Sequence, residues 1–251
     1  MEMTVAGGRE LGKQWPAVAA TLSLSLVGRL ANRLAGASKK PRARIIGVGG
    51  KALSVASWAH LLLRRWHLQW GATDAEIQRP MRGDELVPHP HVETTRALTV
   101  AARPEAIWPW LVQMGYRRGG WYAYDWLDNL GVPSARRIIP ELQDLKVGDK
   151  LTPIEAGFTV AVLEPQRSLV LVTRDKQGRI TTSWAFFIEP LDTGHSRLIE
   201  RIRIRYSRDL GGLFWGLIFE PADFIMMRKQ MLTLKRRAEE AVAADALDAA
   251  L

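Results

Sequence analysis

The sequence EPADFIMMRKQMLTLKRRAEEA, residues 220–241, predicts one long amphipathic helix. Pro221 fits the first helical position, where a missing N–H costs nothing. Apolar residues then recur at alternating three- and four-residue steps, so they share one face. That face consists of Phe224, Met227, Met231, Leu234, Ala238 and Ala241. At about 1.5 Å per residue the helix would extend about 30 Å, so the rest of the chain must supply a surface of that length for it.

The chain before this helix contains a run of predicted strands. The strand candidates are residues 93–102, 157–164, 168–173, 181–189 and 197–206, with a further short one near 146–153. Pro104 opens a predicted helix over residues 104–114, which Pro109 should kink or shift. Residues 115–137 are expected to form an ordered loop with a turn of helix at 125–130. This order predicts an α+β fold with helices on one face of an antiparallel sheet.

The same order resembles the START-like, or SRPBCC, superfamily, and in particular its bacterial polyketide-cyclase-like members. The segments that carry the resemblance are PEAIWPWLVQMGY, GGWYAYDWLDNLG, LKVGD, GFTVAVLEPQRSLVL, TSWAFFIEP, RLIERIRIRY, the terminal helix and the WGAT sequence at 70–73. The resemblance implies a helix-grip fold, in which a curved antiparallel sheet wraps around the last helix. It also implies an apolar cavity between them for a hydrophobic small molecule or lipid. Some members are cyclases or dehydratases and many only bind, so the resemblance leaves catalysis open.

Charge divides the chain near residue 70. Residues 1–70 contain eleven Lys or Arg and two acidic residues, a net charge of +9, whereas residues 71–251 contain twenty-four of each. A neutral remainder argues against a nucleic-acid-binding domain. We expect a basic N-terminal segment (1–70), a connector (71–91), a START-like domain (92–243) and a C-terminal tail (244–251).

Two apolar runs lie in the basic segment, at residues 15–34 and 45–63. The first has a charge-free core of about 14 residues, short of a membrane span, and the second is interrupted by charge and glycine. Residues 64–66, Arg-Arg-Trp, follow in the manner of an interfacial anchor. Three arrangements fit: weak membrane spans, amphipathic segments on an anionic surface, and helices packed on the domain or on another subunit. We expect residues 15–66 to associate with a membrane and the domain to be cytoplasmic.

The connector combines a short helix with an extended stretch. Thr73 and Glu76 form a capping-box pattern that starts a helix, and Pro80 must end it. The following run PMRGDELVPHPH, residues 80–91, is predicted to be extended because of its prolines.

Strand alternation makes Glu200 a candidate catalytic residue. Within residues 197–206 the arginines and Ile199 share one face, and Glu200 lies on the other. The apolar residues on its face are Leu198, Ile202, Ile204 and Tyr206. If that face points at the helix, burial would raise the pKa of Glu200 and suit it to proton transfer or to holding a ligand hydroxyl. Alternatively, Glu200 pairs with an arginine at the sheet edge, or a bulge at Ile199 turns it outward.

The aromatic loop supplies a second candidate pair, Tyr124 and Asp125. They could offer a hydrogen-bond donor and acceptor at a cavity mouth, or act as acid and base. Alternatively, the aromatic residues plug one end of the core and Asp125 caps the short helix. A chaperone-like or assembly function would instead predict an exposed apolar patch around Trp121 to Trp126.

Aromatic residues and methionines are the candidates for lining a ligand cavity, because they adapt to flexible apolar molecules, although each could equally be plain core. These candidates are Trp108, Trp121, Tyr122, Trp184, Phe186, Ile202, Tyr206, Met227 and Met231. The chain has no cysteine and no phosphate-binding glycine motif, and His89 and His91 lack nearby ligand partners. We therefore expect no metal or cofactor. The leading hypothesis is hydrophobic ligand binding, the alternatives are a cyclase or dehydratase and an assembly factor, and the oligomeric state is left open.

Overall fold

The computed structural model describes residues 63–153, 157–206 and 210–248. The chain divides into two compact units, residues 1–68 with 206–222 and residues 69–205 with 223–251. The apolar run 15–34, and all but the last residue of the run 45–63, lie outside the described residues. Among the helices that are described, none is both long and apolar enough to cross a membrane.

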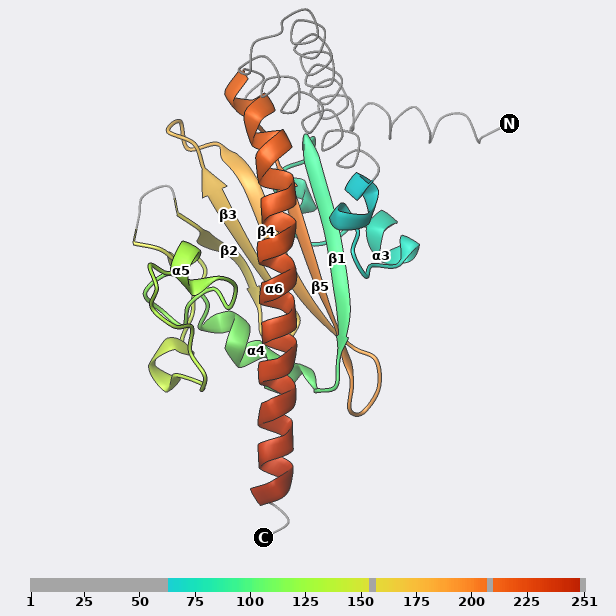
Figure 1. Ribbon diagram of the computed structural model, residues 1–251, viewed down its shortest axis with the longest axis vertical. Helices are drawn as coiled ribbons and strands as arrows, with labels where there is room; N and C mark the ends of the chain where they lie inside the picture. Colours follow the sequence, from blue (N-terminus) through green and yellow to red (C-terminus); the bar gives the residue numbers. More distant parts are fainter. Residues whose placement is uncertain (1–62, 154–156, 207–209, 249–251) are drawn as a thin grey trace, which may run out of the picture. The chain divides into compact units, whose positions relative to one another are not determined.

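The second unit is built on a five-stranded antiparallel sheet in the order β1-β5-β4-β3-β2 (Figure 1). The strands are β1 (Val92–Val100), β2 (Thr159–Glu164), β3 (Ser168–Arg174), β4 (Ile180–Pro190) and β5 (Ser196–Ile204). All five predicted strands are therefore present. The short strand predicted near 146–153 is wrong, because Lys150 makes only an isolated bridge to Thr159. Gly148, with φ +96°, interrupts the extended backbone there.

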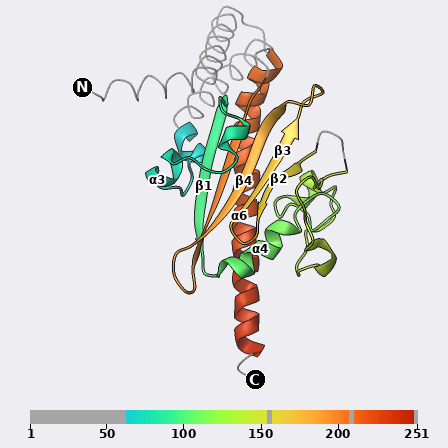
Figure 2. The ribbon, with the colours of Figure 1, turned by 180° about the vertical axis from the view of Figure 1, so that it is seen from behind.

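The long helix α6 runs from Leu210 to Asp248, and its residues in the second unit lie across one face of the sheet (Figures 1 and 2). The predicted buried face is confirmed, since five of its six residues are buried and Ala241 is partly so. The predicted start at Pro221 is wrong, because this proline lies inside the helix. A proline removes one helical hydrogen bond without having to end the helix. The helix also passes the predicted domain end at residue 243.

Two further helices belong to this unit. α4 (Pro104–Val112) begins at the predicted proline and contains Pro109, and α5 (Asp125–Asp128) is the predicted helical turn of the aromatic loop. Figures 1 and 2 both draw this loop beside β2, at the opposite edge of the sheet from β1.

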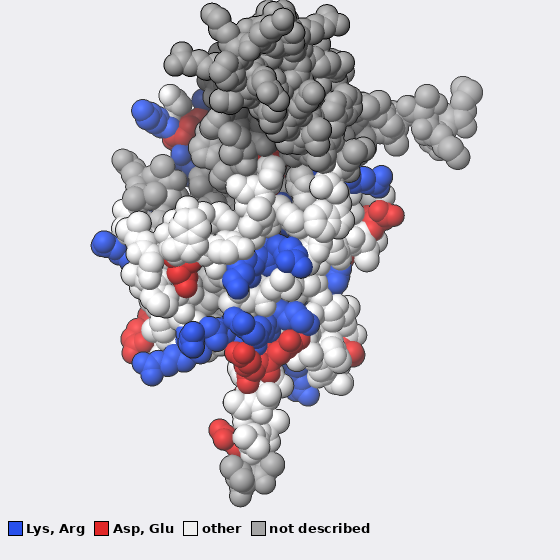
Figure 3. Space-filling view, viewed as in Figure 1, with Lys and Arg blue, Asp and Glu red and all other residues white. Residues whose placement is uncertain are grey.

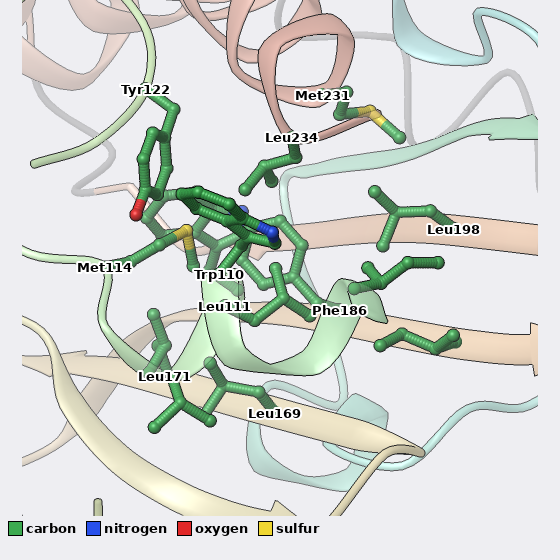
Figure 4. Close-up of a cluster of buried hydrophobic side chains, with 14 of the residues drawn as sticks. Trp110, Leu111, Met114, Tyr122, Leu169, Leu171, Phe186, Leu198, Met231 and Leu234 are labelled. Atoms are coloured by element: carbon green, nitrogen blue, oxygen red, sulfur yellow. The ribbon is translucent and has the colours of Figure 1, made fainter. Parts of the chain in front are cut away.

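The main core lies between the sheet and α6. Leu169, Leu171 and Phe186 from the strands and Met231 and Leu234 from α6 belong to this single cluster (Figure 4). The strands contribute alternate residues to it, as the pleat requires. The architecture is thus the α+β helix-grip arrangement that the resemblance implied.

The connector covers the other face of the sheet. It contains α3 (Asp74–Gln78), with the predicted capping box between Thr73 and Glu76. It also contains a 3-10 turn, η1 (Asp84–Leu86), so the prediction of an extended stretch over residues 80–91 is wrong in this part. Gly83, with φ +93°, allows the chain to turn, and Asp84 accepts a hydrogen bond from the backbone N–H of Met81.

Outward-facing arginines of β5 hold the connector in place. Arg201 donates to the carbonyl oxygens of Glu76 and Arg79 and to the carboxylate of Asp84, and Arg197 pairs with the carboxylate of Glu76. The predicted alternation of β5 is therefore confirmed, with its arginines on the face away from α6.

A buried glutamate is paired in the described part of the first unit. Arg64 donates two hydrogen bonds of 2.9 Å to the carboxylate of Glu220. Arg64 is therefore buried and paired, whereas Trp66 is exposed.

Candidate functional site

Three residues on neighbouring strands lie opposite one another on the face of the sheet that α6 covers. Strand register places Arg96 of β1 directly opposite Glu200 of β5, and Glu200 opposite Phe186 of β4. Residues opposite each other in a sheet point to the same face, and Phe186 belongs to the core under α6. Glu200 is fully buried, as is Arg96. The prediction that Glu200 points at the helix is thus confirmed, and the alternative of an outward-turning bulge is wrong.

A buried ionic cluster surrounds this carboxylate. Arg96 Nη2 donates to Asp223 Oδ2 on α6 at 2.8 Å, and Arg96 Nη1 lies 3.7 Å from Glu200 Oε2. Trp184 Nε1 donates to Glu200 Oε1 at 2.7 Å. The arginine also lies over the ring of Phe224, with 5.6 Å between its guanidinium carbon and the ring centroid. Glu200 therefore does pair with an arginine, but beneath the helix rather than at an exposed edge.

The pKa of Glu200 is raised to about 7, first by burial and also by the nearby negative charge of Asp223. The Arg96 charge and the Trp184 hydrogen bond act in the opposite direction and lower it. Desolvation disfavours the charged form of a carboxyl group, and here it outweighs one arginine that is shared with a second carboxylate. Near neutral pH Glu200 can thus both accept and donate a proton.

Several buried oxygen atoms in this core have no hydrogen-bond partner among the described residues. They are Glu200 Oε2, Thr94 Oγ1 and Gln230 Oε1. The 3.7 Å to Arg96 is too long for a hydrogen bond. Thr94 lies opposite Ile202, a core residue, and so faces α6. Gln230 on α6 is fully buried, and its Nε2 donates to the carbonyl oxygen of Trp121 at 2.7 Å. The interior therefore offers hydrogen-bond acceptors that are surrounded by apolar side chains.

Aromatic rings form the apolar surround next to Glu200. The ring of Trp184 stacks on Trp121 at 5.6 Å between centroids, and it contacts Phe158 at 4.9 Å and Phe186 at 5.0 Å. The structure places most of the predicted lining residues in this one core. They are Trp121, Tyr122, Trp184, Phe186, Ile202, Met227 and Met231, with Trp108 partly buried at its margin.

Two predicted lining residues differ from the rest. Tyr206 lies beyond the end of β5 and belongs to the first unit, so its predicted place in the strand is wrong. The Tyr122 hydroxyl accepts a hydrogen bond of 2.7 Å from Gln113 Nε2, and burial raises the pKa of this phenol to about 12. With φ +61° and this bond, Tyr122 fixes the loop backbone.

The second predicted pair, Tyr124 and Asp125, has a structural arrangement. Asp125 accepts hydrogen bonds from both the backbone N–H and the hydroxyl of Ser134. Tyr124, rather than Asp125, is the N-cap residue of α5, and no side-chain cap is made there. These bonds give Asp125 a structural role in holding the loop, while the predicted capping role is wrong.

Sequence reasoning missed Arg96 and Asp128. Arg96 sits at an inward position of β1 between Thr94 and Leu98, and a charged residue at such a position was an available signal. Asp128 lies in α5, where burial first and the charge of Asp125 second raise its pKa to about 6. Its two oxygens have no hydrogen-bond partner among the described residues, and nothing in the local sequence indicates this.

Comparisons with known proteins give matches only among solved structures. No protein-family model and no curated protein matches the chain. A protein from Mesorhizobium loti is 14% identical, with a TM-score of 0.34 over 59% of this chain and 98% of that one. The Aha1 dimer from Colwellia psychrerythraea is 15% identical, with a TM-score of 0.33 over 57% of this chain and 98% of that one.

A polyketide-cyclase-like protein from Corynebacterium glutamicum is also 15% identical, with a TM-score of 0.27 over 60% of this chain and 87% of that one. Likenesses of this degree carry no weight for function. The chain has an α+β helix-grip fold, which its own strand order and long C-terminal helix establish.

Proposed function

We propose that the protein binds a hydrophobic small molecule or lipid between the sheet and α6, and that this ligand carries a hydrogen-bond donor. The observation that carries the proposal is Glu200 Oε2, which is fully buried and has no hydrogen-bond partner among the described residues. An acceptor left unsatisfied in a protein interior costs about 1–3 kcal/mol, and more when it is charged. A hydroxyl, amine or amide N–H of a ligand would remove this cost.

The surroundings suit the apolar remainder of such a ligand. Trp184 and Phe186 offer aromatic faces, and Met227 and Met231 on α6 are flexible enough to repack around different shapes. Thr94 Oγ1 and Gln230 Oε1 provide further acceptors at other points of the same interior. This combination of many apolar contacts with a few polar groups is typical of small-molecule sites.

Native mass spectrometry of the purified protein tests occupancy. We expect a co-purifying mass that solvent extraction recovers as an apolar compound with a hydroxyl or N–H group. The apolar dye N-phenyl-1-naphthylamine, which has one N–H donor, should then bind to the extracted protein and be displaced by the recovered compound.

A matched pair of variants locates the site. Glu200→Gln replaces one acceptor oxygen by a donor and should weaken dye binding about tenfold, the loss expected for one hydrogen bond. Glu76→Gln alters another carboxylate, paired with Arg197 on the opposite face of the sheet, and should leave dye affinity unchanged. Equal affinities for both variants, or an interior that binds neither dye nor lipid, would refute the proposal.

A second candidate function is acid–base catalysis, such as cyclisation or dehydration. It is favoured by the pKa of Glu200, about 7, which suits proton transfer near neutral pH. For an enzyme, Glu200→Gln should abolish turnover of the recovered compound while the compound still binds. Turnover that survives this substitution would remove Glu200 as the catalyst.

A membrane location through residues 15–66 remains part of the proposal. The net charge of +9 on residues 1–70 and the two apolar runs support it. Cell fractionation distinguishes the arrangements, because surface-bound protein is released by high salt and spanning protein only by detergent. Full recovery in the soluble fraction at low salt would contradict it.

A further inference from the structure

The loop around α5 exposes four apolar side chains within seven residues. Trp126 is 73% exposed, Leu127 53%, Leu130 72% and Val132 58%. We call these four residues the α5 tip. The assembly-factor hypothesis would predict an exposed apolar patch around Trp121 to Trp126. Trp121 is buried, and the exposed residues begin at Trp126.

The backbone holds the α5 tip in one conformation. Leu130 has φ +50°, a left-handed conformation that side chains with a Cβ rarely adopt. The N–H of Gly131 donates to the carbonyl oxygen of Asp125 at 2.7 Å, and Asn129 Nδ2 donates to the carbonyl oxygen of Val132 at 2.7 Å. Apolar side chains are thus fixed outward by a strained and well-bonded loop, which is common at binding surfaces.

The exposed side of α6 combines apolar and basic residues. Ile225, Lys229, Leu232 and Arg236 follow one another at four-, three- and four-residue steps, so they share one face, and all four are exposed. We call them the outer face of α6. Figure 3 shows Lys and Arg side chains gathered in a band across this helix. Among the described residues Lys229 has no ion-pair partner, while Arg236 approaches Glu240 only at 3.9 Å.

The α5 tip and the outer face of α6 belong to neighbouring elements. Gln230 of α6 donates to the carbonyl oxygen of Trp121, five residues before the tip begins. Exposed basic residues also flank the loop in sequence, namely Arg117, Arg136 and Arg137. Exposed apolar side chains with a tryptophan among them, together with basic residues on a neighbouring element, are typical of segments that lie in a membrane interface.

We propose that the α5 tip inserts its apolar side chains into an anionic bilayer surface while the basic residues of the outer face of α6 contact its headgroups. Charge complementarity favours an anionic bilayer. A stable protein interface involves about 20–30 residues on each side, and the α5 tip offers four apolar ones. This surface is separate from residues 15–66 and does not depend on the ligand proposed above.

The absence of cysteine from the chain allows a site-specific test in the full-length protein. Leu127→Cys carries an environment-sensitive nitrobenzoxadiazole label on the α5 tip. Leu191→Cys, in the turn between β4 and β5, is the matched control, because Leu191 is 57% exposed and Leu127 53%. Vesicles of phosphatidylcholine with phosphatidylglycerol are compared with vesicles of phosphatidylcholine alone.

The label on Leu127→Cys should become at least about twofold brighter and shift to the blue with anionic vesicles, because it moves from water into the interface. The label on Leu191→Cys should not change. Membrane binding elsewhere in the chain would not produce this difference, since each label reports only its own surroundings. An unchanged fluorescence of the label at Leu127→Cys, or equal responses at both sites, would overturn the proposal. Unchanged fluorescence is the result expected if the α5 tip binds a protein partner instead.

A second comparison tests the basic contribution. Lys229→Gln combined with Arg236→Gln should weaken the affinity for anionic vesicles about tenfold, because two headgroup contacts are lost. The Leu127→Cys label measures this affinity. Arg167→Gln combined with Lys176→Gln removes the same charge from the turns of the sheet and serves as the control. Equal losses in both double variants would show a general charge effect and overturn the role of α6.

Discussion

Arg96 on β1 and Asp223 on α6 are joined by a hydrogen bond of 2.8 Å between Nη2 and Oδ2, with the arginine side chain fully buried. Glu200, on the neighbouring strand, faces the same guanidinium at 3.7 Å. One positive charge therefore serves two carboxylates beneath the helix. The proposed site is built around this shared charge. Substitutions at these residues should therefore change stability and ligand binding in measurable ways.

Arg96→Met should destabilise the protein by about 3–5 kcal/mol at pH 7.5, because Glu200 and Asp223 both lose their contact with this buried cation. Urea unfolding followed by circular dichroism measures this change. The double variant Arg96→Met with Glu200→Gln should recover part of the loss, since one uncompensated charge is removed. Additive losses in the double variant would show that the two side chains do not interact.

Stability should fall as pH rises through the titration of Glu200. Its pKa is raised from 4.5 to about 7 in the folded protein, so the folded state holds the proton more tightly than the unfolded chain. The stabilisation is fully present below about pH 4.5 and is lost as pH rises through about 7, by at most about 3 kcal/mol. Urea unfolding at a series of pH values should show this slope in the native sequence and a weaker one in Glu200→Gln. An unchanged slope would assign the titration to other groups.

Asp128→Asn should stabilise the protein at pH 7.5 by about 1 kcal/mol or less, after allowance for screening by solvent. Burial and the charge of Asp125 raise the pKa of Asp128 to about 6, so its ionised form is disfavoured in the folded state above that pH. Thermal melts at pH 7.5 and pH 4 should show the gain only at the higher pH. Asp125→Asn is the control and should lower the melting temperature, because Ser134 loses a charged acceptor.

Valine substitutions at the two neighbouring threonines of β1 should have different effects on stability. Thr95 Oγ1 accepts a hydrogen bond of 3.0 Å from Arg201 Nε on the outer side of the sheet, and Thr95→Val should cost about 1–3 kcal/mol. Thr94 Oγ1 has no hydrogen-bond partner among the described residues, so Thr94→Val should leave stability without ligand unchanged or slightly higher. Similar losses of stability in both variants would mean that Thr94 is bonded in solution.

The periodic features of the fold were readable in the sequence. The alternation of residues 197–204 placed Glu200 on the helix side and the arginines on the other, because successive side chains of a strand point to opposite faces. The buried face of α6 followed from helical spacing, and the capping box at Thr73 followed from two residues three positions apart. Each of these relationships lies within a single element, where backbone geometry alone determines which residues are neighbours.

Relationships between distant segments required the tertiary structure. Arg96, Glu200 and Asp223 are far apart in the chain, and only strand register and the position of α6 bring them together. The same holds for the exposure of the α5 tip and for the continuation of α6 through Pro221, where the tertiary structure overrides a local signal. The sequence by itself determined which residues share a face within β5 and within the amphipathic part of α6, because that depends on short-range periodicity. The tertiary structure decided which charges share one buried environment, because burial and pairing depend on contacts that no local pattern encodes.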